Sequence, residues 1–262
     1  MKRSIRIYQA YIKTSFARTV AYLGDFYSSI FSACMFTIFH ITQILLLTSK
    51  APVVFGWSRD ELIILTLFYN FIRGLFSIFF SGGVNSMTET IFKGDLDGLL
   101  LKPINTQFLT SLRYIEFYGI IRLVITVGVV AWFVAVKGLH ITLGGVLLAG
   151  LLSIFGVLLL YSIWFMAVTL LIWNPVLTNI KDLLAYITGL FRYPPELFKQ
   201  FGAEAFIVLL PFLLIFMPSS RALVGKLSLA DGLSLVIFSL GFLYLSHLFW
   251  QFALKHYTSA SS

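Results

Sequence analysis

Long apolar runs separated by short polar segments make up almost the whole chain. The longest uncharged run extends from Gly138 to Ile180 and contains no Asp, Glu, Lys or Arg. A membrane-spanning helix needs about 20 apolar residues at a rise of about 1.5 Å each, so this run has room for more than one crossing. A soluble core helix has no reason to be apolar on every side over such a length. The pattern predicts a protein embedded in a membrane.

The apolar runs predict six spans, at about residues 20–48, 62–81, 106–136, 141–173, 178–191 and 232–254. Asn174 and Pro175 end the fourth, because proline cannot continue the helical hydrogen bonds. The apolar stretch 205–220 is short for a crossing and contains Pro211. We therefore expect residues 192–230 to form a re-entrant helical pair on the extracellular side, with a seventh span as the alternative.

The first 18 residues carry an apolar stripe at helical spacing, formed by Ile5, Tyr8, Ile12 and Phe16. Basic residues lie off this stripe, which predicts an interfacial amphipathic helix over residues 1–18 at the cytoplasmic headgroups. Its expected lipid anchors are Arg3, Arg6, Lys13 and Arg18. A solvated arm is the alternative. A basic cluster before the first span favours a cytoplasmic N-terminus, and six spans then place both termini in the cytoplasm.

Composition narrows the possible classes. Apolar residues make up 59% of the 262 positions and charged residues 11%, against about 25% in a usual soluble protein. This leaves one domain, residues 1–262, without room for a soluble catalytic domain. The net charge of +8 does not indicate nucleic-acid binding, since no soluble basic fold accompanies it. The expected fold class is all-α: a polytopic membrane protein with six transmembrane helices, an N-terminal interfacial helix and a re-entrant helical pair before the last span.

Few residues have the pattern of a chemical site. Arg73 lies halfway along the second predicted span, where a lipid-facing charge costs roughly 2.5–3.5 kcal/mol. It should face a partner, a polar cavity or a carboxylate, in a functional or a structural role. His40 and His247 have no second histidine at metal-ligand spacing, which favours hydrogen-bonded packing. We predict no catalytic, cofactor-binding or metal-binding residue, and no phosphate loop is present.

One polar segment, residues 86–105, has an internal design. Ser86 and Glu89 have capping-box spacing, which predicts a short helix from Met87, and Gly94 can end it in the left-handed conformation. Asp95 or Asp97 can then cap a second short helix that Pro103 stops. Asn105 is the expected cap of the third span.

The second of these short helices contains the leucines Leu96, Leu99, Leu100 and Leu101. A cytoplasmic loop cannot bury such a group alone, so we expect it to face a protein partner or the membrane surface. The alternative is that the leucines fold onto the ends of the chain's own spans.

The order of these parts resembles the permease subunits of ABC-2 type transporters over nearly the whole chain. The sequence segment from Lys93 to Asn105 is most similar to that family, and Trp250 with residues 257–262 is a weaker match. The resemblance implies half of an export path in a bacterial plasma membrane, and a coupling helix that docks on a separate ATPase. The implied coupling residues are Glu89, Lys93, Gly94, Asp95, Leu96, Asp97, Leu99, Leu100 and Lys102.

The implied partners are two copies of an ABC ATPase, membrane lipids and a second permease, either identical or a paralogue. ATP and Mg would bind to the ATPase, so this chain would not be an enzyme. Two other classes compete with this interpretation. A secondary transporter or channel subunit would favour ionisable residues at mid-membrane, where only Arg73 qualifies. A membrane-embedded lipid enzyme would need clustered acid, base or metal ligands, and the spans show no such set.

Overall fold

The computed structural model describes residues 2–21, 23–51, 53–174, 177 and 179–257, and their side chains except those of 2–10, 18, 23 and 205. A short hairpin accompanies the helices, and each of its strands, β1 (Val53–Val54) and β2 (Trp57–Ser58), has two residues. The helices are α1 Lys2–Ala21, α2 Leu23–Leu47, α3 Arg59–Phe76, η1 Ser77–Ser81, α4 Gly82–Phe92, α5 Leu96–Leu100, α6 Thr106–Leu112, α7 Tyr118–Lys137, α8 Leu143–Thr169, η2 Leu170–Ile172, α9 Ile180–Leu190, α10 Glu196–Lys199, α11 Ala203–Leu223 and α12 Leu229–Lys255. The all-α fold class is confirmed.

Six helical stretches of the described chain are long and apolar enough to cross a membrane. They are 24–47, 59–92, 118–137, 143–172, 206–223 and 229–255. Five lie where the apolar runs predicted them. The exception is the predicted fifth span at 178–191, because α9 has only 11 residues and is about 16 Å long.

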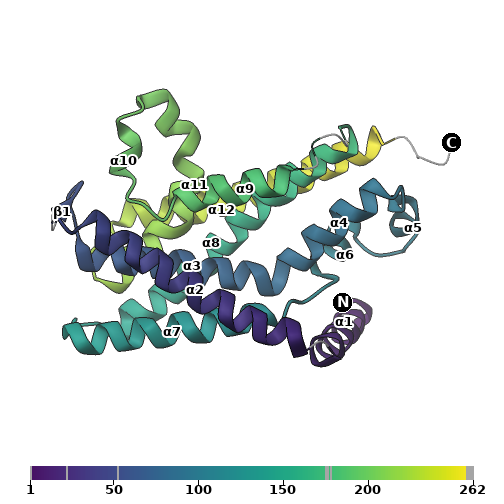
Figure 1. Ribbon diagram of the computed structural model, residues 1–262. Coiled ribbons are helices and arrows are strands. Elements are labelled where there is room, and N and C mark those ends of the chain that lie inside the picture. Colours follow the sequence, from purple (N-terminus) through teal and green to yellow (C-terminus); the bar gives the residue numbers. More distant parts are fainter. Residues whose placement is uncertain (1, 22, 52, 175–176, 178, 258–262) are drawn as a thin grey trace.

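Both described chain ends lie at the same end of the bundle (Figure 1). We call this the α5 end and the opposite one the β1 end. The bundle helices run between the two ends, whereas α1 is seen almost along its axis, so α1 lies across the bundle. A helix across the bundle suits the headgroup layer, as predicted for residues 1–18.

The second span is one long helix with a π-helical turn inside it. α3, η1 and α4 follow one another without a break from Arg59 to Phe92, so Ser86 lies within a helix. The predicted capping box at Ser86 is therefore wrong, since a cap requires the helix to begin there. The true capping box is at the start of α3, where the side chain of Ser58 and that of Glu61 each bind the other's backbone N–H.

The π-helical turn has a structural consequence. Its wider hydrogen-bond spacing leaves backbone groups without the usual helical partners. The backbone carbonyl of Ile78, inside the turn, accepts a hydrogen bond of 3.1 Å from the backbone N–H of Glu116. Glu116 belongs to the segment between α6 and α7. The turn thus connects the second span to the start of the third.

The third predicted span, 106–136, is divided in two. α6 ends at Leu112 and the membrane-length helix α7 begins only at Tyr118. α6 packs so closely on α4 that a Cβ on Gly83 would lie 2.0 Å from the carbonyl oxygen of Ser111. Glycine is required at this contact, because the two backbones touch.

Residues 181–196 connect the two ends of the bundle. The Lys181 ammonium donates to Asn85 in α4, toward the α5 end, at 3.2 Å. Glu196 accepts from the indole N–H of Trp57, at the β1 end, at 2.7 Å. The chain therefore traverses the bundle here as α9 followed by a nonhelical segment, and α9 does not do so alone.

The segment from α10 to the start of α12 begins and ends at the β1 end of the bundle. Arg221, in the last turn of α11, pairs with Glu196 at 3.5 Å and with Asp231 in α12 at 2.8 Å. Glu196 precedes α11, so both flanks of α11 lie at the β1 end, where α10 and the start of α11 rise above the bundle in Figure 1. Re-entry of residues 192–230 stays a prediction, with its two flanks tied together by these contacts.

The part of this segment expected to bend at Pro211 is a single helix, α11, which follows the short helix α10. α11 continues through Pro211 and Pro218, so the predicted break at Pro211 is wrong. Each proline removes one backbone hydrogen bond. Residues 213–220 are all buried, and packing of α11 against α8, α3 and α12 can stabilise the helix despite this loss.

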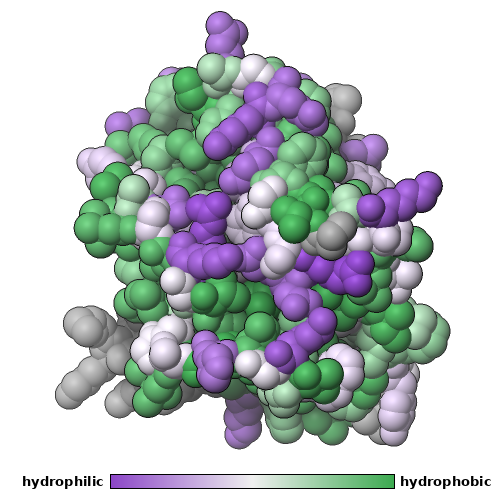
Figure 2. Space-filling view, turned by 90° about the vertical axis from the view of Figure 1, so that its left-hand side faces the viewer, coloured by the Kyte–Doolittle hydropathy of each residue, from purple (hydrophilic) through white to green (hydrophobic). Residues whose placement is uncertain are grey.

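The β1 end is a polar surface (Figure 2). Hydrophilic side chains cross its centre and hydrophobic ones surround them. Lys137 pairs with Asp60 at 3.2 Å, and Lys226 pairs with Glu61. The first contact joins the end of α7 to the start of α3. The second joins the loop before α12 to the start of α3. A polar surface capping an apolar belt is what a membrane protein presents to water.

The contact between α8 and α11 depends on one glycine. A Cβ on Gly156 would lie 2.5 Å from the carbonyl oxygen of Ile215, so we expect Gly156→Ala to destabilise the protein by about 1–3 kcal/mol through overpacking. Gly150→Ala is the matched control on the same helix, because nothing lies within 4 Å of its Cβ position. Unfolding of both variants in detergent measures the difference. Equal stability would show that α8 and α11 do not approach as described.

Candidate functional site

The polar segment at the α5 end confirms several predicted details. Gly94 ends α4 with a φ of 72°, in the left-handed region. Asp95 precedes α5, although its side chain makes no cap hydrogen bond. The side-chain oxygen of Asn105 caps α6 by accepting from the backbone N–H of Phe108 at 3.0 Å. The segment therefore folds as the last turns of the long second span followed by the short helix α5, both at the α5 end of the bundle (Figure 1).

The leucines of this segment divide into two groups. Leu96 and Leu99 are buried, with 1% and 6% of their surface exposed, and both belong to the main hydrophobic core. Leu101 is 85% exposed, and Leu100 is half-buried. The expectation that the whole group is exposed is therefore wrong for Leu96 and Leu99. A five-residue helix with two leucines in its first turn and last turn can bury both on one side, which fastens α5 to the bundle.

The remaining side chains form an exposed surface, which we call the docking face. It consists of Glu89, Phe92, Lys93, Asp95, Leu101 and Lys102. Glu89 and Lys93 are one helical turn apart, with their charged atoms 3.9 Å from each other. Of the other predicted coupling residues, Gly94, Asp97 and Leu100 are half-buried. The docking face surrounds two exposed apolar side chains, Phe92 and Leu101, with charged ones, and exposed apolar patches with a polar rim mark interaction sites.

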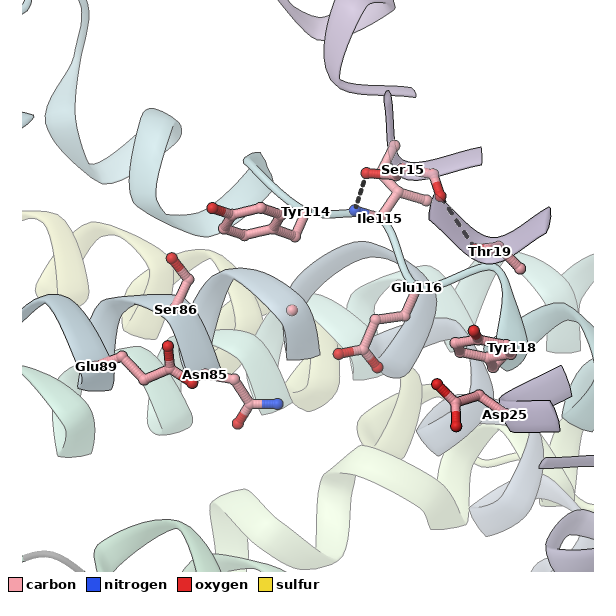
Figure 3. A pocket seen from close by; sticks show the side chains of 11 residues that line it. Ser15, Thr19, Asp25, Asn85, Ser86, Glu89, Tyr114, Ile115, Glu116 and Tyr118 are labelled. Carbon is pink, nitrogen blue, oxygen red and sulfur yellow. Dashed lines mark hydrogen bonds between the residues drawn. The ribbon is translucent and has the colours of Figure 1, made fainter. Parts of the chain in front are cut away.

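A cleft of about 670 Å³ lies beside the docking face (Figure 3). α1, α2, α4 and the segment between α6 and α7 line it. Glu89 contributes to both the cleft and the docking face, and Asp25 and Glu116 point into the cleft from its other side. No lysine or arginine lines it among the described residues. Sequence reasoning missed this acidic cleft, because its three carboxylates come from separate segments.

The α1 helix is fastened at this cleft. The Ser15 hydroxyl, which is buried, accepts a hydrogen bond of 3.2 Å from the backbone N–H of Ile115. Phe16 packs edge-on against Phe117, with ring centroids 5.5 Å apart, and is still 56% exposed. Lys13 is exposed, whereas the side chains of Arg3, Arg6 and Arg18 lie outside the described residues. The anchoring role of these four basic residues stays a prediction.

A buried polar network seats α6 on the bundle. The Gln107 amide nitrogen donates to the hydroxyls of Tyr161 in α8 and Ser246 in α12, both at 3.2 Å. His247 lies 2.8 Å from the Gln107 amide oxygen. His247 thus has the hydrogen-bonded packing role predicted for it. The Trp250 indole N–H donates to Thr106 at 3.0 Å, while residues 258–262 of the weaker motif lie outside the described residues.

Arg73 lies between aromatic rings. Its guanidinium carbon is 5.2 Å from the ring centroid of Trp164 and 5.7 Å from that of Phe76. One terminal nitrogen, Nη1, is buried and has no hydrogen-bond partner among the described residues. Arg122 in α7 lies close enough to Arg73 for the two charges to interact, which sequence reasoning did not anticipate. His40 is hydrogen-bonded to the Asn70 side chain at 3.2 Å, as its packing role required.

Comparison with known proteins decides the family. A family model described as "ABC-2 family transporter protein" matches residues 33–261, which is most of the chain. The chain belongs to the ABC-2 transporter family. None of the curated proteins and none of the solved structures matches it. The family match and the six apolar helices make the chain a multi-pass membrane permease, a transport component that is not itself catalytic.

The two groups of leucines in α5 of this permease predict opposite effects of the same substitution. Leu99→Asp would place a charge in the core and should destabilise the protein by about 3–5 kcal/mol. Leu101→Asp, at a side chain that is 85% exposed, should change stability by less than about 0.5 kcal/mol. Thermal unfolding in detergent measures both. A stable Leu99→Asp variant would contradict the burial of that side chain.

Proposed function

We propose that this chain is the permease subunit of an ATP-driven exporter, and that its docking face binds a separate cytoplasmic ATPase. The observation that carries the proposal is the position of the docking face on a rigid support. Leu96 and Leu99 fasten α5 to the core, and the exposed Phe92 and Leu101 remain for a partner. Family membership supports an ATPase as that partner.

The long helix from Arg59 to Phe92 supplies a mechanism of coupling. Its last turn carries part of the docking face, and its middle carries Arg73. The helix is continuous apart from the irregular hydrogen bonding of its π-helical turn, so a displacement at α4 can be transmitted along its axis. Movement of an ATPase against α4 and α5 would therefore reach the middle of the membrane directly. The segment from Glu116 to Tyr118 would move with it, because the Glu116 N–H is bonded to Ile78.

The assembly that follows contains two permeases and two ATPase subunits. This permease would supply half of the path, and the second half would come from an identical or related chain. ATP and Mg would be bound by the ATPase, so ATP hydrolysis is not expected of this permease alone. The α5 end would face the cytoplasm of a bacterium, with both termini there, since the docking face must reach a cytoplasmic partner. The basic N-terminal residues favour the same orientation.

Two exposed leucines at opposite ends test the docking face. We expect Leu101→Asp to reduce co-purification of an ATPase subunit at least tenfold, because an unpaired charge would replace an apolar contact at the interface. Leu229→Asp is the control, since Leu229 is 79% exposed at the start of α12, at the β1 end. The measurement is the amount of ATPase bound per tagged permease. Unchanged binding in both variants would place the ATPase elsewhere.

Cysteine labelling tests the orientation. Cys34 is the chain's one cysteine, so Cys34→Ser provides a cysteine-free background. We expect Leu229→Cys to react with a membrane-impermeant maleimide on intact spheroplasts, and Leu101→Cys to react only after the membrane is opened. The reverse result would invert the proposed topology. Reaction of both on intact spheroplasts would be incompatible with the α5 and β1 ends lying on opposite sides.

A further inference from the structure

A polar stripe runs along one face of the long second helix. It consists of Thr66, Asn70, Arg73, Ser77, Ser81 and Asn85, each three or four residues from the next. This spacing places all six on one side of a helix. The stripe faces other spans and not lipid alone, because its members bond to three separate elements. These are His40 in α2, Glu116 before α7 and Lys181 in α9, each at 3.2 Å.

Three arginines lie near the part of this stripe that is closer to the β1 end, around Asn70 and Arg73. Arg73 belongs to α3, Arg122 to α7 and Arg192 to the segment after α9, and all three are half-buried. The side-chain stem of Arg122 lies against Gly74, 3.6 Å from its Cβ position. Arg122 lies within electrostatic range of Arg73, and both Arg122 and Arg192 lie within such range of His40, which is hydrogen-bonded to Asn70 of the stripe. We call Arg73, Arg122 and Arg192 the arginine cluster.

Depth in the membrane makes this cluster costly. Arg73 lies about 20 Å beyond the start of α3, at about 1.5 Å per residue, which is near the middle of a hydrocarbon core about 30 Å thick. Charges at such depth are normally paired. Glu116 is the carboxylate within reach of Arg122, and it also accepts from the Ser77 hydroxyl at 3.2 Å. One carboxylate beside three arginines leaves an excess of positive charge.

Three buried donors at this place make no hydrogen bond, and the Gln43 amide oxygen in α2 is a buried acceptor without a partner among the described residues. Arg73 Nη1, Arg192 Nε and Asn70 Nδ2 are buried and have no partner among the described residues. The Asn70 oxygen lies 3.2 Å from His40 Nδ1, so its amide nitrogen is the group left over. Buried donors without acceptors are unfavourable, and a ligand rich in acceptor oxygens would satisfy them. Excess positive charge and free donors together specify an anionic group.

A second copy of this permease is not suited to supply that group. Apart from Glu116, the carboxylates lie in the first or last turn of a helix, within the five-residue helix α5, or in a connecting segment. They are Asp25, Asp60, Glu61, Glu89, Asp95, Asp97, Asp182, Glu196, Glu204 and Asp231. An identical neighbour therefore offers no other carboxylate at the depth of Arg73.

We propose that the arginine cluster and Asn70 bind the anionic headgroup of an amphiphile, a phosphate or a carboxylate, between α2, α3, α7 and α9. The apolar surfaces of the spans, rich in phenylalanine, would accommodate its hydrocarbon part. As the recognition site of a cargo, this rests on the proposed permease function. As a binding site, it does not require an ATPase, so the two proposals can fail separately.

The test compares amphiphiles that share one chain and differ in head charge. Dodecyl phosphate, dodecyltrimethylammonium and inorganic phosphate are titrated into the full-length permease in dodecyl maltoside, and binding is followed by the thermal midpoint. We expect dodecyl phosphate to raise the midpoint and the cationic amphiphile not to. Inorganic phosphate should bind at least tenfold more weakly, since it lacks the chain. If dodecyl phosphate and inorganic phosphate bound equally well, the ligand would be a free anion, and the proposal of an amphiphile would be wrong.

Substitution of Asn70 by aspartate would supply, within the protein, the negative charge that the proposed ligand brings. Asn70→Asp is almost isosteric and should raise the midpoint without ligand by about 2–4 °C, because it neutralises excess positive charge. It should also abolish the effect of dodecyl phosphate. Asn85→Asp is the control on the same stripe, where the side chain pairs with Lys181, and should leave the dodecyl phosphate effect unchanged. An unaltered ligand effect in Asn70→Asp would overturn the site.

Removal of a single charge completes the test. Arg73→Gln keeps hydrogen-bond donors but no charge, and should weaken dodecyl phosphate binding about tenfold or more. Arg113→Gln is the control, since Arg113 lies over the Tyr114 ring, outside the cluster. If Arg73→Gln lowered the midpoint without ligand and left ligand binding intact, Arg73 would have a structural role only. ATPase co-purification of these variants should be normal, which separates this site from the docking face.

Discussion

The long helix from Arg59 to Phe92 is the constraint on which the rest of the structure depends. In hydrocarbon every backbone polar group needs a partner, and a continuous helix provides these within its own chain. This helix is the most buried of the six membrane-length helices, followed by residues 206–223, whereas most residues of the other four are not buried. α7, α11, α2 and α8 all pack against α3, and α6 packs on α4. Its position therefore determines where the neighbouring spans can lie.

Close packing around this helix is achieved by small residues and not by hydrophobicity alone. Lipid tails are as apolar as leucine, so apolar side chains give little preference for protein over lipid. A Cβ on Gly119 of α7 would lie 3.0 Å from the carbonyl oxygen of Gly74, and Gly83 touches α6. These contacts allow backbones to approach and dispersion forces to accumulate. The bundle thus forms a defined scaffold, which the docking face and the polar stripe both require.

The sequence predicted what depends on local pattern. Apolar length located five of the six membrane-length helices, and Gly94 and Asn105 were correctly assigned to helix ends because a φ above zero and a cap are local features. It missed what depends on tertiary packing. Ser86 has capping-box spacing, yet the span continues through it. Pro211 lies inside α11 because neighbouring helices hold that segment.

The same distinction applies to the candidate sites. Leu96 and Leu99 cannot be separated from Leu101 by sequence, since all three are leucines in one short helix and only the fold shows which side meets the bundle. The arginine cluster was visible only as Arg73. Arg122 and Arg192 lie far from it along the chain, and the fold brings Arg122 within electrostatic range of Arg73 and Arg192 within that of His40.

The π-helical turn relates these two sites. It lies between Arg73 and the last turn of α4, so it divides the helix into a part inside the arginine cluster and a part that carries the docking face. Such turns are rare, occur frequently at functional sites, and change which residues face a given neighbour. Here the turn also holds Glu116, whose carboxylate is the counter-charge near Arg122 and lines the acidic cleft. A small change in this turn would therefore alter the charge balance of the cluster and the shape of the cleft together. That arrangement gives a partner bound at the α5 end a physical means to change the affinity of the membrane site for an anion.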